Sequence, residues 1–148
     1  MDSDLNQNVD FFKCKLCFKE IIKSRMRLHI GFHVLNGDTL PNANLCGFCG
    51  LVDGCNVELV TSSGFGKSKT LGPKSNCSYF FTFSLKPASK GSIRSPCTNR
   101  PIICEICNEC IWSYNINYHY QSKHNLNDVP NELKITEKLI KHSKFNLD

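Results

Sequence analysis

The chain has 148 residues, enough for one ordinary domain or two very small ones, and it contains ten cysteines. No apolar run approaches the roughly 20 residues that a membrane-spanning helix needs, and the polar, acidic first residues do not form a signal peptide. We therefore expect a soluble intracellular protein whose cysteines mostly bind metal, because disulfide frameworks belong to oxidising compartments.

The net charge of +5 is unevenly distributed along the chain. Residues 13–33 carry six cations and one acid, and residues 59–104 carry seven cations and no acid. The rest of the chain carries five cations and twelve acids. This segregation predicts basic faces that attract polyanions, although a solvated surface explains most single lysines.

The chain opens with an acidic segment, residues 1–10, that we expect to be disordered. Residues 11–34 follow as a first unit with the pattern C-x2-C-x11-H-x3-H. Two thiolates on a tight turn and two imidazoles one helical turn apart can bind one tetrahedral zinc ion. The alternative is a pair of reduced cysteines beside two surface histidines, but four ligands at this spacing favour zinc. The predicted ligands are Cys14, Cys17, His29 and His33.

This first unit resembles the two-cysteine two-histidine zinc finger, with Phe12 before the first cysteine, but its cysteine-to-histidine interval is one residue shorter than in the common finger. In such fingers the base-facing helix positions correspond here to Ile22, Arg25 and Leu28. Two of these residues are apolar, which argues against ordinary base reading. Contacts to phosphates remain available to a set of cations, namely Lys13, Lys15, Lys19, Lys23, Arg25 and Arg27.

Residues 35–43 contain Asn-Gly and Pro signals and read as a linker, and residues 44–126 read as a compact cysteine-rich unit. Within that unit, polar and apolar residues alternate from Cys55 to Leu59, which predicts a half-buried strand. A second strand is expected from Tyr79 to Leu85. The Gly, Ser and Lys content of residues 61–76 predicts a flexible, hairpin-like loop whose cations could join those of the first unit.

Cys46-Gly47-Phe48-Cys49-Gly50 reads as a zinc knuckle and needs a second pair of ligands. Cys77 and Cys97 are the predicted pair, because each lies at the edge of an expected strand or loop. Cys55 shares a strand face with apolar residues and is expected to pack in the core. The predicted four-cysteine site is therefore Cys46, Cys49, Cys77 and Cys97.

The first pattern recurs later in the chain as C-x2-C-x11-H-x4-H. Recurrence of the same interval makes coincidence less plausible and predicts a second finger, with a helix between Trp112 and His124. Cys110 could replace a histidine as ligand or remain a free thiol, and we favour the free thiol. The predicted ligands are Cys104, Cys107, His119 and His124. Residues 127–148 are expected to form an amphipathic helical tail.

Residues 45–124 resemble a group of poorly characterised fungal zinc-finger proteins. The resemblance lies in the CGFCG segment at 46–50, in Cys77 before an aromatic stretch, in SPCTNRPI at 95–102, and in WSYN at 112–115 before the two histidines. This family has no established activity. The resemblance therefore implies metal binding and a single unit, with the tail as a short helix belonging to it.

These observations predict a small zinc-stabilised α+β fold of short strands, knuckles and finger helices with little apolar core, and three zinc ions. The expected function is nucleic-acid binding through phosphates with weak sequence specificity, regulatory or related to mobile elements, in the nucleus. A zinc-stabilised protein-interaction module is the alternative, based on Trp112, Tyr114, Tyr118 and the tail. A metal-dependent nuclease is less favoured, because no catalytic constellation is visible. We do not expect the protein to be an enzyme. We expect neither a small-molecule substrate nor a membrane partner.

Overall fold

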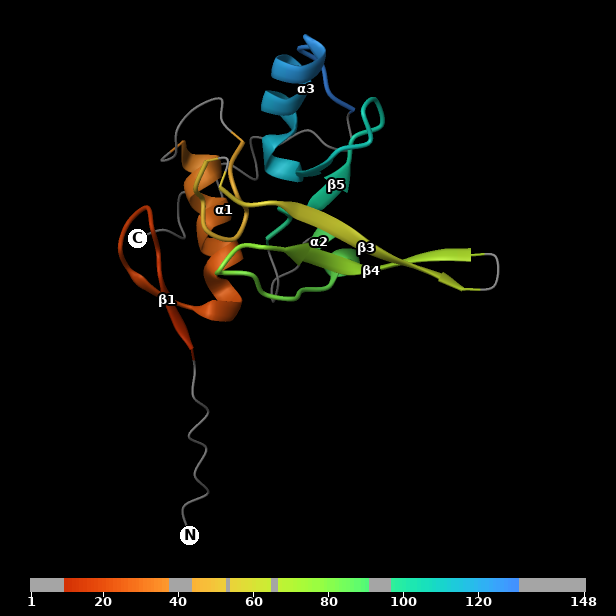
Figure 1. The fold of residues 1–148 in the computed structure, drawn as a ribbon. Coiled ribbons are helices and arrows are strands. Elements are labelled where there is room, and N and C mark those ends of the chain that lie inside the picture. Colours follow the sequence, from red (N-terminus) through yellow and green to blue (C-terminus); the bar gives the residue numbers. More distant parts are fainter. Residues whose placement is uncertain (1–9, 38–43, 53, 65–66, 91–96, 131–148) are drawn as a thin grey trace.

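The computed structural model describes residues 10–37, 44–52, 54–64, 67–90 and 97–130. Over these residues the protein is a small α+β fold, with three α-helices and three two-stranded antiparallel sheets. Two finger-like units, each a hairpin followed by a helix, lie on either side of a central cysteine-rich segment (Figure 1). The predicted tail helix lies outside the described residues.

The first finger is a short hairpin packed against a helix. Phe12 and Ile21 are paired across the hairpin, and both pack against the buried side chains of Met26 and Ile30 from the helix. The helix ends where Gly37 takes a left-handed φ of 76°, a conformation that favours glycine. The elements are β1 (Phe11–Lys13), β2 (Glu20–Ile22), the 3-10 turn η1 (Lys23–Arg25) and α1 (Met26–Asn36).

The same order of elements recurs in the second finger, as the repeated spacing predicted. Ile111 is buried with Ile116 and Tyr120, which are the positional counterparts of Met26 and Ile30. The predicted helix is confirmed from Ile116 onward, whereas the residues before it form a strand and a 3-10 turn. The elements are β5 (Pro101–Ile103), β6 (Cys110–Trp112), η2 (Ser113–Asn115) and α3 (Ile116–His124).

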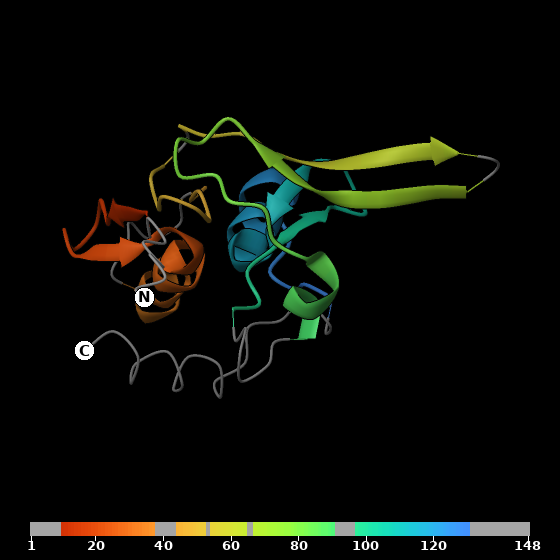
Figure 2. The same ribbon diagram turned by 90° about the horizontal axis from the view of Figure 1, so that it is seen from below.

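The middle segment contains a long two-stranded ribbon, β3 (Val57–Gly64) with β4 (Lys67–Ser75). Strand β3 packs on β5 and β6 of the second finger, and the far end of the ribbon projects away from both fingers (Figure 2). The predicted strand at residues 55–59 is confirmed in part. Residues 61–76, predicted as a flexible hairpin-like loop, do belong to a hairpin, but most of them are paired strand and not loop. The Gly and Ser residues there do not prevent pairing, since the ladder uses backbone groups. Gly72 takes a φ of 153° next to the register shift after Val60.

The expected strand at residues 79–85 is also wrong. The chain turns directly after Cys77, where the Phe80 amide donates to the Cys77 carbonyl, and then reaches helix α2 (Leu85–Lys90) without pairing to another strand. Phe80 and Phe83 pack instead on the central aromatic cluster, where both rings contact Phe48. The apolar residues that suggested a strand are therefore buried as aromatic rings that extend from a loop into the core.

The central core is aromatic and is shared between the middle segment and the second finger. The rings of Phe48 and Trp112 meet edge to face at 4.9 Å, and Phe83 stacks on Trp112 at 6.3 Å. Phe48 and Trp112 are almost completely buried. A ring from β6 of the second finger thus fills the interior of the middle segment, so the two fold as one body.

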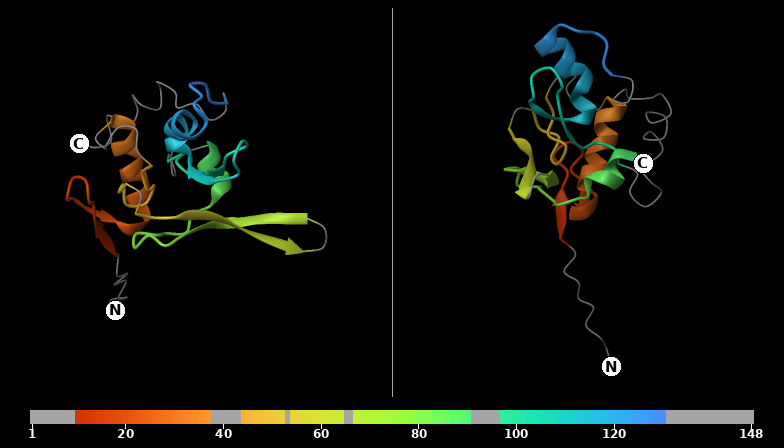
Figure 3. Two further views of the ribbon diagram at one scale, coloured as in Figure 1. Left: turned by 45° about the horizontal axis from the view of Figure 1, so that its top comes forward. Right: turned by 90° about the vertical axis from the view of Figure 1, so that its right-hand side faces the viewer.

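Helix α1 packs against η2, the turn that leads into α3, and both views of Figure 3 show α3 near one end of α1. A Cβ atom at Gly31 of α1 would lie 3.3 Å from the ring of Tyr114 in η2, so the two fingers approach each other closely. The Asn115 amide donates to the Leu45 carbonyl at 2.7 Å, which fixes the second finger to the central knuckle. Among the described residues, no helix is both long and apolar enough to cross a bilayer.

Replacing Gly47 by alanine is expected to destabilise the zinc-loaded protein strongly. A Cβ atom there would lie 2.4 Å from the buried Trp112 ring, and overpacking of this kind costs about 1–3 kcal/mol. Gly54→Ala is the matched control, because the nearest atom to its new Cβ is 3.8 Å away. Thermal unfolding of both variants checks this, and equal melting temperatures would show that Trp112 is not held where the structure has it.

Candidate metal centres

Three groups of cysteine and histidine side chains could hold a metal ion among the described residues. In each group the four candidate ligand atoms all lie within 4.8 Å of one another. The groups are Cys14, Cys17, His29 and His33; Cys46, Cys49, Cys55 and Cys77; and Cys104, Cys107, His119 and His124. Eleven of the twelve residues predicted as ligands are therefore found in these groups, and Cys97 is the exception.

The first group forms between the β1–β2 knuckle and helix α1. The Sγ atom of Cys17 lies 3.3 Å from Nε2 of His29, and the Nε2 atoms of His29 and His33 are 3.1 Å apart. The Leu16 amide lies 3.4 Å from Sγ of Cys14 and can donate to it. Burial, with the nearby His33 charge, lowers the pKa of His29 to about 4, so this imidazole is neutral at neutral pH as metal ligation requires.

The second finger repeats this arrangement. Sγ of Cys104 lies 3.4 Å from Nε2 of His124, and Sγ of Cys107 lies 3.4 Å from Nε2 of His119. Burial, with the neighbouring His124, lowers the pKa of His119. The second finger has one more residue between its two histidines than the first finger has. His124 still reaches the other three ligands, because it is the last residue of α3.

The middle group contains Cys55 where the sequence predicted Cys97. Sγ of Cys55 lies 3.8 Å from Sγ of Cys49. Cys55 and Cys77 stand two residues outside the terminal pair of the ribbon, Val57 with Ser75, so continuation of the ribbon register brings them opposite each other. The amides of Phe48 and Tyr79 lie 3.4 Å from the sulfurs of Cys46 and Cys77, respectively.

Cys97 lies elsewhere and has a different partner. Its sulfur is 3.1 Å from the Arg27 guanidinium, which also donates to the carbonyl of Asn99. The same guanidinium stacks on Phe83 at 3.8 Å from the ring centroid. The prediction that Cys97 completes the four-cysteine site is therefore corrected: Cys97 is buried beside an arginine that joins the first finger to the rest of the fold.

The sequence contained a signal from which Cys55 could have been predicted as a ligand of the middle group. Reading residues 57–75 as one hairpin places Cys55 and Cys77 on opposite strands at the same distance from the turn. Reading residues 61–76 as a loop removes that register and leaves Cys55 as a core residue. Cys55 does pack partly against the central core, so the core prediction and the ligand position coexist.

The spacing in all three groups suits a tetrahedral ion. Ligand atoms at the corners of a zinc tetrahedron, with Zn–S near 2.3 Å and Zn–N near 2.0 Å, lie roughly 3.3–3.8 Å apart. The five ligand pairs named above lie 3.1–3.8 Å apart, close to this range. Hydrogen bonds from Cys46 and Cys77 lower the pKa of Cys49, which favours the thiolate form that a metal ligand needs.

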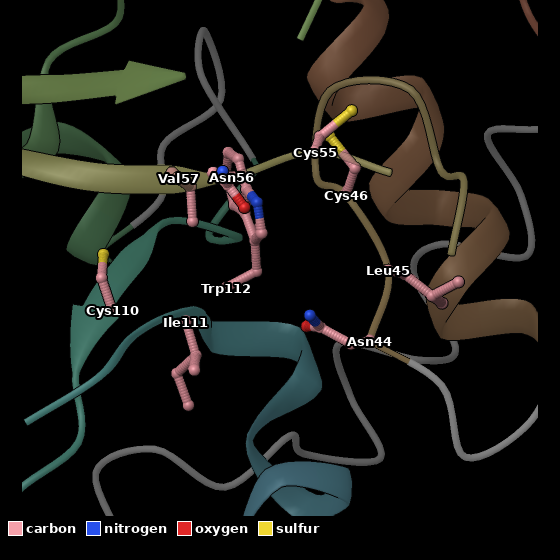
Figure 4. A pocket seen from close by; sticks show the side chains of 9 residues that line it. All are labelled: Asn44, Leu45, Cys46, Cys55, Asn56, Val57, Cys110, Ile111 and Trp112. Atoms are coloured by element: carbon pink, nitrogen blue, oxygen red, sulfur yellow. The ribbon is translucent and has the colours of Figure 1, made fainter. Parts of the chain in front are cut away.

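Cys110, which the sequence left open as a ligand or a free thiol, belongs to none of the three groups. It lines a cavity of about 240 Å³ between the central knuckle and β6 (Figure 4). The sulfurs of Cys46 and Cys55 point toward one another there, and Cys110 lies apart from them. Burial raises the pKa of Cys110 to about 11, which keeps this thiol protonated and unreactive.

The cations of the two basic stretches differ in accessibility. Lys13, Lys15, Lys19 and Arg25 on the first finger are exposed, whereas Arg27 is turned into the molecule. Lys74 is exposed but lies 3.9 Å from Glu58, and Arg100 donates to the Thr98 carbonyl. The side chains of Lys67 and Lys69, and the whole of Arg94, lie outside what the structure describes.

No protein-family model matches the chain, and no curated protein or solved structure is significantly similar to it. The resemblance to fungal zinc-finger proteins accordingly stays a prediction.

Proposed function

We propose that this is a zinc protein in which three structural zinc ions fix the fold, and that it binds nucleic acid through phosphate contacts made mainly by the first finger. The observation that carries the first part is the convergence of four cysteine or histidine ligands at each of three places. Thiolate and imidazole ligands at tetrahedral spacing favour zinc over hard cations such as magnesium or calcium.

A structural role for the zinc follows from the number of ligands. A catalytic zinc ion keeps one coordination position for water or substrate, whereas four protein ligands close the site. Each of the three groups offers four. Within the part of the chain that the structure describes, a metal-dependent nuclease therefore lacks a site of the required kind, and we expect the ions to serve stability alone.

The basic surface of the first finger supports nucleic acid as the partner. Lys13, Lys15, Lys19 and Arg25 are exposed there, and the only acid between Lys13 and His33 is Glu20. Clustered cations release counterions from a phosphate backbone when they bind it, and this favours association with any sequence. DNA as the partner would agree with a nuclear location.

Base reading by helix α1 has little support. The side of α1 at Gly31 lies against Tyr114, and Arg27 is held by Cys97 and Asn99. A recognition helix must enter the major groove with free polar side chains. The geometry thus favours phosphate contacts with weak sequence specificity.

The alternative, a protein-interaction module, has less support, because its main aromatic candidates for partner contact are buried. Trp112 packs against Phe48, and the Tyr114 hydroxyl bonds to Thr98 at 2.8 Å, so both residues are committed to the interior. Tyr118 is half-buried on α3. The tail that supported this alternative lies outside the described residues from position 131 onward.

The proposal predicts salt-dependent binding to a generic duplex. Lys15→Ala and Lys19→Ala should each reduce the slope of log K against log salt by about one unit, equally on unrelated sequences, because each removes one phosphate contact. Lys123→Ala is the matched control, since Lys123 is exposed on the second finger beside Glu109 and should not contact phosphate. Titrations at several salt concentrations test this, and a sharp motif selected from random oligonucleotides would contradict it.

A further inference from the structure

Phe18 is an unusual residue for its place in the first knuckle. Its φ is 65°, in the left-handed region that bulky residues rarely adopt, and its side chain is 68% exposed. The conformation costs steric energy, and the exposed ring forgoes the gain from burial. Strained residues of this kind concentrate at functional sites.

The second finger shows that the fold does not require a phenylalanine there. Asn108 occupies the corresponding position with a φ of 62°. The amides of Phe18 and Asn108 donate to the carbonyls of Cys14 and Cys104, respectively, each at 2.9 Å. Asparagine is among the residue types that tolerate this conformation best. The two knuckles thus have the same backbone, and only the first carries an exposed aromatic ring.

The charges around the two knuckles are opposite. Lys15 and Lys19 of the first finger correspond to Glu105 and Glu109 of the second, and all four are exposed. Lys13 places its ammonium 5.9 Å from the centre of the Phe18 ring. A polyanion would therefore be attracted to the first knuckle and repelled by the second.

A second exposed aromatic residue continues this surface. Phe11 is 56% exposed and pairs with Ile22, which is 37% exposed, across the β1–β2 hairpin. Phe11 and Lys13 alternate with the inward-facing Phe12, so they share the outer face of the strand. The outer face therefore presents Phe11, Lys13 and then Phe18.

We propose that this outer face binds single-stranded nucleic acid, with Phe18 stacked on an unpaired base and with Lys13 and the neighbouring Lys19 at the flanking phosphates. This inference rests on the nucleic-acid binding proposed above and specifies that the preferred nucleic acid is single-stranded. Stacking on an aromatic side chain needs a base whose face is uncovered, which a duplex does not offer along its length. DNA and RNA strands share this chemistry.

The test uses the full-length, zinc-loaded protein and fluorescence anisotropy with labelled oligo-dT, oligo-U and a duplex of equal length. Phe18→Asn should keep the knuckle, since asparagine occupies the same conformation in the second finger, and should weaken single-strand binding by about tenfold or more. Duplex affinity should stay unchanged. Phe18→Tyr should retain single-strand binding, because it keeps an aromatic face.

Ile106→Ala is the matched control, since Ile106 is an exposed apolar residue on the second knuckle and should have no effect. Tighter binding of oligo-dT or oligo-U than of the duplex supports the inference, and the stronger of these two single strands shows whether the ligand is DNA or RNA. If Phe18→Asn left single-strand affinity unchanged while Lys15→Ala weakened it, stacking would be refuted and phosphate binding would stand. If Phe18→Asn instead abolished self-association, the ring would serve a contact between copies. If no nucleic acid bound at low salt, both proposals would fail.

Discussion

Removing the metal with a strong chelator is expected to unfold most of the described fold. Structural zinc sites contribute on the order of 10 kcal/mol each, comparable to the whole stability of a typical small domain. The apolar core of the described residues is divided into three small clusters, each of which includes at least one candidate metal ligand. Loss of the ions would leave buried thiols and imidazoles unpaired, so we expect loss of far-ultraviolet circular dichroism and of a cooperative melting transition.

Elemental analysis before chelation should give three zinc ions per chain, one for each group. Adding zinc back under reducing conditions is the control and should restore the spectrum. An unchanged melting temperature after complete metal removal would mean that the apolar core is sufficient without zinc.

Cys55→Ser is expected to lower the zinc content from three ions to two, because it removes one of the four ligands of the middle group. Cys97→Ser should keep all three ions, since its sulfur lies beside Arg27. A serine hydroxyl at 97 can still accept a hydrogen bond from the guanidinium, so the cost should be only about 1 kcal/mol. Elemental analysis of the two purified variants, with thermal unfolding, measures both effects.

The comparison is matched, because both variants replace a buried or half-buried cysteine of the same segment with the same residue. Cys14→Ser serves as a positive control, and should also give two zinc ions by removing a ligand of the first finger. A zinc content of two for Cys97→Ser and three for Cys55→Ser would restore the ligand set that the sequence suggested.

The arrangement around Arg27 shows why the accessible charges could not be counted from the sequence. Six cations between Lys13 and His33 looked equivalent, but the Arg27 guanidinium stacks on Phe83 and donates to the Asn99 carbonyl. Those partners lie more than fifty residues away in the chain. Local spacing cannot indicate such a contact, because it exists only after the first finger packs on the middle segment.

The sequence alone determined both fingers, since their ligands lie within one hairpin and one helix and the spacing fixes their convergence. It also determined the central knuckle at Cys46 and Cys49. Only the tertiary structure decided that Cys55, and not Cys97, completes the middle group, because the register of the β3–β4 ribbon brings Cys55 opposite Cys77. Long-range pairing through backbone groups is nearly independent of side-chain type, so the glycine- and serine-rich strands gave little sign of the ribbon that sets this site.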